Sequence, residues 1–270
     1  MLRKLLMLWM IAVVGWVSAA AATRGNAPGN KPCGAWQENF NAGQLDLTRW
    51  TIASGPAPGY LPNQHVGYYD PANVSLDSGL LSLTLTQSAG VVDSNPDGII
   101  SYGSLIYTTA VCGYGTYEWT MKMSSTAICG ACVGSAIAGS VSAGFLYVNN
   151  SQTEIDFEFS GQNPNTMWLV NWRNPDPRSD PPGSSETITA LAPFDATSGF
   201  HTYKLIWSAD RIRYYVDSVW IADHTTNVPS APAHFMINHW GTDSSAWGGP
   251  ASVGVARYFY VTRASYTPLR

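Results

Sequence analysis

The sequence predicts an all-β protein built as a sandwich of two antiparallel sheets. Apolar and polar residues alternate with a period of two in segment after segment, which is typical of strands that bury one face. Turn-forming residues, 25 glycines and 17 prolines, recur between these segments. No convincing amphipathic helix follows the N-terminal region. Many short strands separated by turns favour a two-sheet sandwich.

The first 22 residues have the composition of a signal peptide. Arg3 and Lys4 precede an apolar run over 5–17, and small residues at 18–22 supply a cleavage region. The run is shorter than the roughly 20 residues that a membrane-spanning helix needs, although an uncleaved anchor is the alternative. We therefore expect a secreted, extracellular protein with a signal peptide at 1–22, a linker at 23–35 and one domain over 36–270.

The same alternation places individual strands. Clear examples are residues 81–86, 117–123, 153–159, 234–240 and 257–261. A hairpin is expected where residues 211–216 and 220–222 flank a turn at Asp217 and Ser218. No repeat and no change in composition divides the chain after Trp36, which favours a single domain.

Composition excludes one class of partner and suggests another. Charged residues make up 12%, about half the usual share, and the formal net charge is −4. A nucleic-acid-binding protein needs a basic surface to displace counterions from phosphate, so we expect no nucleic-acid partner. The 11 Trp, 14 Tyr and 8 Phe residues suit either sugar-binding surfaces or a β-rich core, and composition leaves both open.

Four cysteines, Cys33, Cys112, Cys129 and Cys132, favour disulfides in an exported protein. Cys129 and Cys132 form a C-x-x-C pair without a second pair or a histidine cluster nearby, which argues against a zinc site. Pairing Cys33 with Cys112 and Cys129 with Cys132 is one of three connectivities, and the sequence does not choose among them.

Three carboxylates, which we call the acidic trio, alternate along residues 153–159. Glu154, Asp156 and Glu158 point to one face of a strand, and the apolar residues between them point to the other. Acidic residues are disfavoured in strands and repel one another on a shared face. A solvated outer face or a calcium cluster is the alternative, but solvated faces usually mix in Lys, Thr or Arg.

The spacing of the trio fits glycoside hydrolysis. Residues i and i+4 on a strand are about 13 Å apart at Cα, and side chains leaning toward one sugar ring close most of that gap. A retaining glycosidase needs two carboxyl groups about 5–5.5 Å apart, one as nucleophile and one as proton donor. A third carboxylate between them can hydrogen-bond one glutamate and raise the proton affinity of its neighbour.

The run Glu-Ile-Asp-Phe-Glu-Phe-x-Gly at 154–161 resembles the catalytic strand of glycoside hydrolase family 16. Further similarity to this family, and within it to the bacterial lichenases (endo-β-1,3-1,4-glucanases), lies at residues 113–122, 200–207, 215–217, 228–232 and 236–240. The resemblance implies a catalytic domain folded as a β-jelly roll with a long open cleft on its concave sheet. It implies Glu154 as nucleophile, Glu158 as general acid/base and Asp156 as their orienting partner.

The resemblance also implies residues that contact the substrate. Along the cleft these are Asn171, Asn238, Trp240, Phe145 and Tyr147, and in a rim loop over 54–70 they are Tyr60, Asn63 and His65. Core packing is the alternative for the aromatic residues. The asparagines could instead satisfy local backbone groups.

Three departures from the lichenase pattern affect these expectations. Gln152 and Thr153 stand where lichenases commonly place Trp-Asp, which weakens the expectation of strict mixed-linkage specificity. Residues 127–138 resemble an insertion that carries the C-x-x-C pair and could reshape one end of the cleft. Phe259 stands where lichenases often place a calcium-binding aspartate, and phenylalanine offers no oxygen ligand. We therefore expect no metal at that position and no cofactor, with a structural calcium on backbone carbonyls elsewhere as the alternative.

The leading functional prediction is a secreted, monomeric, retaining endo-β-glucanase that hydrolyses β-1,3-1,4- or β-1,3-linked glucan. No membrane partner is expected after removal of the signal peptide. A transglycosylase that transfers xyloglucan or glucan chains is the alternative, because the same carboxylates serve both reactions. A non-catalytic carbohydrate-binding protein is a further alternative that the complete trio argues against. A purely structural sandwich would neither bind nor cleave a glucan.

Overall fold

The computed structural model describes residues 33–270 except 78, 177, 179–183 and 192–193. The predicted signal peptide and most of the linker lie outside the described residues. In the described part, the regular secondary structure consists of strands and one short 3-10 helix at Pro71–Asn73. Within it, no helix has the length and apolar character that crossing a membrane requires.

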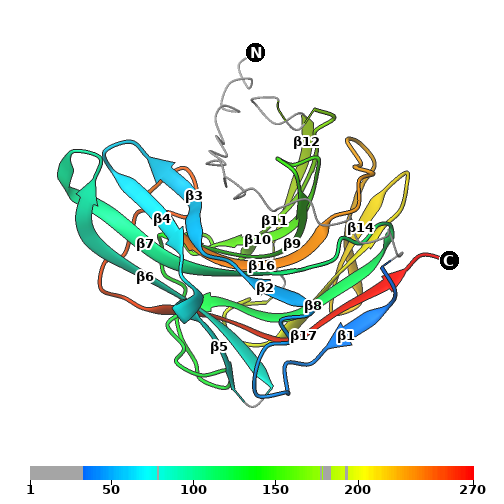
Figure 1. Ribbon diagram of the computed structural model, residues 1–270, viewed down its shortest axis with the longest axis horizontal. Helices are drawn as coiled ribbons and strands as arrows, with labels where there is room; N and C mark the ends of the chain where they lie inside the picture. Colours follow the sequence, from blue (N-terminus) through cyan, green and yellow to red (C-terminus); the bar gives the residue numbers. More distant parts are fainter. Residues whose placement is uncertain (1–32, 78, 177, 179–183, 192–193) are drawn as a thin grey trace.

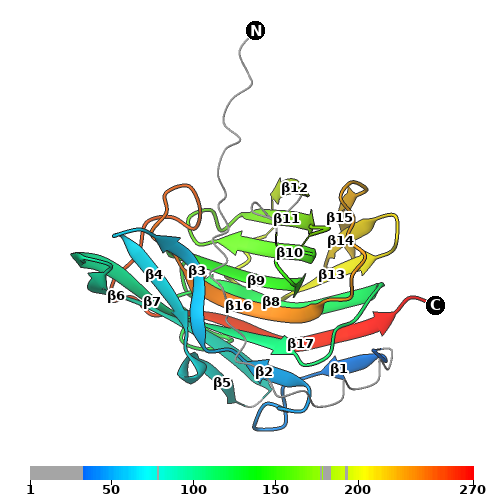
Figure 2. The ribbon, with the colours of Figure 1, turned by 45° about the horizontal axis from the view of Figure 1, so that its top comes forward.

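One sheet, which we call the outer sheet, extends in Figure 2 from the lower side of the molecule to its upper right. In spatial order its strands are β5 (Val74–Asp77), β6 (Leu80–Val92), β17 (Arg257–Pro268), β8 (Gly115–Ser125), β13 (His201–Trp207), β14 (Ile212–Val216) and β15 (Val219–His224). The short strand β1 (Trp36–Glu38) pairs with the second half of β17. It lies on the same edge of β17 as β6, which pairs with the first half of that strand. Every pairing in this sheet is antiparallel.

The second sheet, which we call the inner sheet, packs on the first. Its strands are β12 (Ser184–Leu191), β11 (Thr166–Arg173), β10 (Thr153–Ser160), β9 (Ser140–Val148), β16 (His234–Gly241), β7 (Asn95–Thr108) and β2 (Trp50–Ile52). The first half of β7 instead pairs with β6 and, in parallel, with β4 (His65–Tyr69), and β4 pairs with β3 (Gly55–Leu61). Figure 1 shows β3 and β4 on one side of β10, β9 and β16, and β11 and β12 on the other.

The hydrophobic core lies between the two sheets. Phe235 of the inner sheet stacks on Trp119 of the outer sheet with 4.3 Å between ring centroids. Leu81, Leu83 and Leu85 are fully buried, as their alternation with Ser and Thr predicts. The face of the inner sheet that is turned away from this core, which we call the open face, is the one that carries the functional residues described below.

The predicted strands are confirmed. The five alternating segments lie within β6, β8, β10, β16 and β17, and the expected hairpin is β14–β15. Asp217 and Ser218 both have positive φ, 47° and 68°, as the two central residues of a type I′ turn require.

The disulfides are Cys33–Cys112 and Cys129–Cys132, one of the three connectivities that the sequence left open. The Lys122 ammonium donates hydrogen bonds to the carbonyls of Gly130 and Cys132 at 3.1 and 2.5 Å. Lys122 lies on the side of the outer sheet away from the core. The C-x-x-C part of residues 127–138 therefore covers the outer sheet. The other end of this segment lies near the open face, because a Cβ at Gly249 would be 2.9 Å from the Cβ of Ala138.

Candidate active site

Strand β10 presents the acidic trio on the open face. Its alternate residues, Ile155, Phe157 and Phe159, are buried in the core with at most 3% of their surface exposed. The Phe157 ring packs edge-on against Tyr203 and Tyr214 of the outer sheet, with centroid distances of 5.5 and 5.2 Å. A slip of one residue would expose these rings and bury the carboxylates. Core packing thus fixes the face on which the trio lies.

Each carboxylate is flanked by one residue of β9 and one of β11. The flanking pairs are Tyr147 and Trp172 for Glu154, Phe145 and Val170 for Asp156, and Ala143 and Trp168 for Glu158. Directly opposed residues of an antiparallel pair share a face, so the surroundings of the trio are largely apolar and aromatic. Such surroundings favour protonated carboxyl groups and offer flat rings to a sugar.

The pKa values of both glutamates are raised above the usual range. Burial raises the pKa of Glu154 to about 7, and a hydrogen bond from the Ser151 hydroxyl to its Oε2 acts in the opposite direction. Burial, and then the charge of Glu154, raise the pKa of Glu158 to about 8. The Ser151 hydrogen bond thus favours the ionised form of Glu154, and the charge of Glu154 favours the protonated form of Glu158. A carboxylate beside a carboxylic acid is the pair that nucleophilic attack with proton donation requires.

Asp156 lies between the two glutamates and is 2% exposed. Burial, followed by the charges of Glu154 and Glu158, raises its pKa well above the usual range. The surroundings therefore favour the neutral form of Asp156.

Beyond Ala143, strand β16 places Asn238 on the same face as Glu158. The Asn238 Nδ2 donates to the Tyr69 hydroxyl at 3.4 Å. Burial and, to a smaller extent, the charge of Glu158 raise the pKa of Tyr69. Among the described residues, neither Asn238 Oδ1 nor Trp168 Nε1 has a hydrogen-bond partner. Glu158 thus lies between an unsatisfied acceptor and an unsatisfied donor, which sugar hydroxyls can satisfy.

An apolar cluster forms the floor of the open face around the trio. It consists of Tyr69, Leu105, Val141, Ala143, Phe145, Met236 and Trp240, with Tyr147 and Trp247 packed against it. Four of the predicted cleft residues, Phe145, Tyr147, Asn238 and Trp240, therefore lie on the face of the trio.

The predicted rim loop folds as β3 and β4. The Tyr60 hydroxyl and the Asn63 backbone N–H both donate to Asp93 Oδ2, at 2.9 and 2.8 Å, so these residues hold the loop to the β6–β7 turn. His65 is fully buried and pairs through its ring nitrogens with Gly59 O at 2.5 Å and Ser101 Oγ at 2.6 Å. This placement corrects the expectation that His65 contacts the substrate, because its ring has no exposed surface.

Asn171 lies on the wrong face for its predicted role. It is opposite Ile155, so its side chain points away from the open face. Its Nδ2 donates to the carbonyls of Thr226 and Asn227 at 3.1 and 2.8 Å, and its Oδ1 pairs with His224 Nδ1 at 2.6 Å. Asn171 therefore holds the segment after β15 against the inner sheet, and the structure contradicts a direct substrate contact.

Sequence reasoning missed several residues on the open face. Trp168 and Trp172 lie on either side of Asn171 in the alternation of β11, and this alternation was the signal that could have found them. Tyr69 follows Tyr68, and only the pairing of β4 decides which of the two faces the floor. Ser151 had no sequence signal, because its contact with Glu154 depends on the turn geometry.

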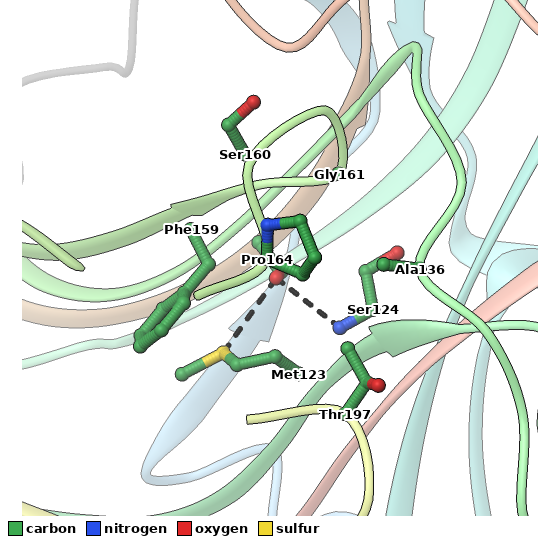
Figure 3. A pocket seen from close by; sticks show the side chains of 9 residues that line it. Met123, Ser124, Ala136, Phe159, Ser160, Gly161, Pro164 and Thr197 are labelled. Atoms are coloured by element: carbon green, nitrogen blue, oxygen red, sulfur yellow. Dashed lines mark hydrogen bonds between the residues drawn. The ribbon is translucent and has the colours of Figure 1, made fainter. Parts of the chain in front are cut away.

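A small void lies on the other side of the inner sheet. Figure 3 shows it beside Met123, Ser124 and Phe159, and its volume is about 10 Å³. The Ser142 hydroxyl accepts from Ser124 N at 3.3 Å and donates to Met123 Sδ at 3.6 Å there. Because Phe159 points into the core, the void is separate from the acidic trio. Its volume corresponds to about one water molecule.

The described residues contain no group of three or more His, Cys, Asp or Glu side chains arranged to hold a metal ion. Phe259, which stands at the expected calcium position, is fully buried in the core. Its strand pairs it with Leu83 of β6, so the ring lies between the two sheets.

Comparison with known proteins places the chain in a family. The sequence model of glycosyl hydrolases family 16 matches residues 63–256. The chain belongs to glycosyl hydrolase family 16. A beta-glucanase of Acetivibrio thermocellus is 30% identical over 255 residues, which cover 92% of this chain and 65% of that protein. The chain thus spans just under two thirds of the length of this family relative.

Solved structures of the family confirm the jelly-roll fold. The Bacillus licheniformis beta-glucanase superposes with a TM-score of 0.70 at 25% identity, covering 88% of this chain and all of that one. A β-1,3-1,4-glucanase (lichenase) derived from a mouse hindgut metagenome gives a TM-score of 0.70 at 22% identity, with 88% of this chain covered and 100% of the other. The predicted all-β architecture and the predicted family are both confirmed.

Proposed function

We propose that the protein is a retaining endo-β-glucanase that hydrolyses β-1,3-1,4- or β-1,3-linked glucan at the acidic trio. The observation that carries this proposal is the placement of Glu154 and Glu158 on one open strand face, with Asp156 between them and apolar surroundings that raise the pKa of both glutamates. The family and the beta-glucanase names of the relatives support the substrate class. The open face continues on both sides of β10, which suits attack in the middle of a polymer.

The reaction proceeds in two displacements. The Glu154 carboxylate attacks the anomeric carbon, the bond to the leaving oxygen breaks, and that oxygen takes the proton of Glu158. A glycosyl ester on Glu154 results. The Glu158 carboxylate then takes a proton from water, whose oxygen attacks the anomeric carbon and displaces Glu154. The two inversions together retain the configuration of the anomeric carbon. Both reacting groups are side chains of the protein, so the proposed reaction needs no cofactor.

In this proposal, Asp156 and the floor of the open face hold the glutamates and the substrate in position. Asp156, whose surroundings favour its neutral form, orients the two glutamates. The partly exposed Tyr147 ring faces the sugar units, and Phe145 and Trp240 form the buried floor beneath them. Asn238 accepts from a sugar hydroxyl group through its Oδ1.

Product analysis of the purified protein tests the proposal. Mixed-linkage glucan, laminarin, xyloglucan and a galactan are each offered to the wild type and to Glu154→Ala. We expect cleavage of one β-glucan that the variant loses. Proton NMR of the first product reads the anomeric configuration, and the β-anomer is expected. An α-anomer would contradict the double displacement, and no cleavage of any polymer would contradict the hydrolase.

Transglycosylation on the same site is the second candidate. Trp168 and Trp247 pack edge-on at 4.9 Å beside the Glu158 end of β10, and such an aromatic wall suits an acceptor sugar in place of water. Labelled acceptor oligosaccharides added to the same reaction distinguish the two. Label that enters longer products indicates transfer, and label that remains free indicates hydrolysis.

We also propose that the protein is secreted and monomeric. The basic, apolar and small-residue regions at 1–22 support export. N-terminal sequencing of protein recovered from the medium tests the cleavage site, and light scattering of the same sample tests the oligomeric state.

A further inference from the structure

We propose that Ser151 is a positioning residue for Glu154. In this inference the Ser151 hydroxyl holds one oxygen of the attacking carboxylate and leaves the other oxygen directed at the sugar. The inference rests on the proposed function and adds to it a residue outside the acidic trio. It is carried by one hydrogen bond, from Ser151 Oγ to Glu154 Oε2, and by the geometry of the turn that supplies it.

Three successive residues of the β9–β10 turn have left-handed backbone conformations. The φ angles of Asn149, Asn150 and Ser151 are 43°, 49° and 58°. Asparagine adopts this region comparatively often, whereas serine does so rarely. Strained backbone of this kind persists only where the surrounding structure determines it, and it gathers at functional sites. The strain at Ser151 is matched by a contact with a member of the trio.

The turn is clamped from outside. The Asn174 backbone N–H donates to Ser151 O at 3.0 Å, and its Nδ2 donates to Asn150 O at 2.8 Å. Within the turn, Gln152 N donates to Asn149 O at 3.1 Å. Ser151 is 2% exposed. Its hydroxyl is therefore held in place before a substrate arrives, and the substrate does not have to order it.

The other groups around Glu154 do not favour its ionised form. Asp156 and Glu158 come from its own strand, Tyr147 faces it from β9 and the uncharged Trp172 faces it from β11. Burial, and then the charge of Glu154, raise the pKa of Tyr147 to about 12. Against this background, the Ser151 hydrogen bond is the interaction that lowers the pKa of Glu154. The nucleophile must be ionised to attack, so the contact acts on the reactive form.

The test compares Ser151→Ala with a matched control, Asn149→Ala, in the full protein. Both substitutions place alanine at a left-handed position of the same turn. Within the described part of the chain, however, the Asn149 side chain donates only to Gln152 Oε1 at 3.3 Å, at the surface. If Ser151→Ala fails to fold, Ser151→Gly removes the hydroxyl while tolerating positive φ. Far-UV circular dichroism establishes folding for each variant.

The first readout is the pH dependence of kcat/KM. Loss of a charge-assisted hydrogen bond is expected to move the acid limb upward by about one pH unit in Ser151→Ala, which is about a tenfold loss below that limb. KM at the optimum changes little, and Asn149→Ala follows the wild type. Equal acid limbs in wild type, Ser151→Ala and Ser151→Gly would overturn the inference while leaving the proposed function intact.

The second readout does not need activity. Carbon-13 NMR follows the carboxyl carbon of Glu154 through a pH titration, with Glu154→Gln assigning the signal. We expect the midpoint to rise in Ser151→Ala and Ser151→Gly but not in Asn149→Ala. A wild type that cleaves no glucan would defeat the proposed function, yet this titration would still decide whether Ser151 acts on Glu154. Identical midpoints in all proteins would refute the contact.

Discussion

The Asn238 amide donates from Nδ2 to the Tyr69 hydroxyl at 3.4 Å, which orients its Oδ1 so that no described residue satisfies it. Asn171, two strands beyond β9, shows the opposite arrangement, because both ends of its amide are bonded within the protein. The two asparagines were predicted to share one role. Their hydrogen bonds assign them different roles, one toward a ligand and one toward the fold.

Substitution of each asparagine by alanine separates these roles. Asn238→Ala is expected to lower kcat/KM about tenfold through the loss of one substrate hydrogen bond, with Tm within about 2 °C of the wild type. Asn171→Ala is expected to cost about 2–4 kcal/mol of unfolding free energy, because it leaves buried partners unsatisfied. Urea unfolding and steady-state kinetics on the same samples measure both. A large stability loss in Asn238→Ala with unchanged kinetics would reverse the assignment.

The pH dependence of kcat/KM follows from the raised pKa values of the two glutamates. Glu154 must be ionised and Glu158 protonated, so activity falls as pH drops below about 7 and as pH rises above about 8. The two limbs belong to the coupled pair. Glu158→Gln is expected to lose about 10²–10⁴ in rate on polysaccharide.

An aryl glycoside with a good leaving group provides the control for this profile. Such a substrate needs no proton donor, so Glu158→Gln is expected to retain bond cleavage and to lose the alkaline limb. Retention of the alkaline limb in this variant would show that another group supplies it.

The sequence alone was sufficient to predict the strands and the shared face of the acidic trio, because both follow from the period-two alternation of apolar and polar residues. Ile155, Phe157 and Phe159 determine the buried face of β10, and the trio must then lie on the other. The prediction for Asn171 failed because it rested on the family resemblance and not on the place of Asn171 in the alternation of Trp168, Val170 and Trp172. The predicted substrate contact of His65 failed for another reason. Its burial depends on Ser101 and Gly59, which reach it through the pairing of distant strands.

Asp156 provides a stability prediction with a defined sign. Its pKa in the folded protein lies above the unfolded value of about 3.9, so its contribution to stability is fully present below about pH 4 and is lost as pH rises toward the folded-state pKa. Asp156→Asn stays neutral at every pH. We expect the variant to gain about 2–6 °C in Tm at pH 7 and to match the wild type near pH 3, while losing activity. Thermal scans across pH measure the difference, and a constant difference would contradict the burial of an ionisable group.

The contact between β3 and Trp240 provides the last prediction. Gly59 has φ +90°, and a Cβ there would lie 2.8 Å from Gly241 O and 2.9 Å from the Trp240 ring. Gly55, on the same strand, has φ +107°, and a Cβ at that position would meet no atom within 4 Å.

Gly55→Ala therefore measures backbone strain alone, and Gly59→Ala adds the collision with Trp240. We expect Gly59→Ala to cost about 1–3 kcal/mol more than Gly55→Ala and to change the tryptophan emission spectrum. Because Trp240 belongs to the floor of the open face, KM for glucan is expected to rise in Gly59→Ala and to stay unchanged in Gly55→Ala. Equal behaviour of the two variants would mean that β3 does not hold Trp240 in place.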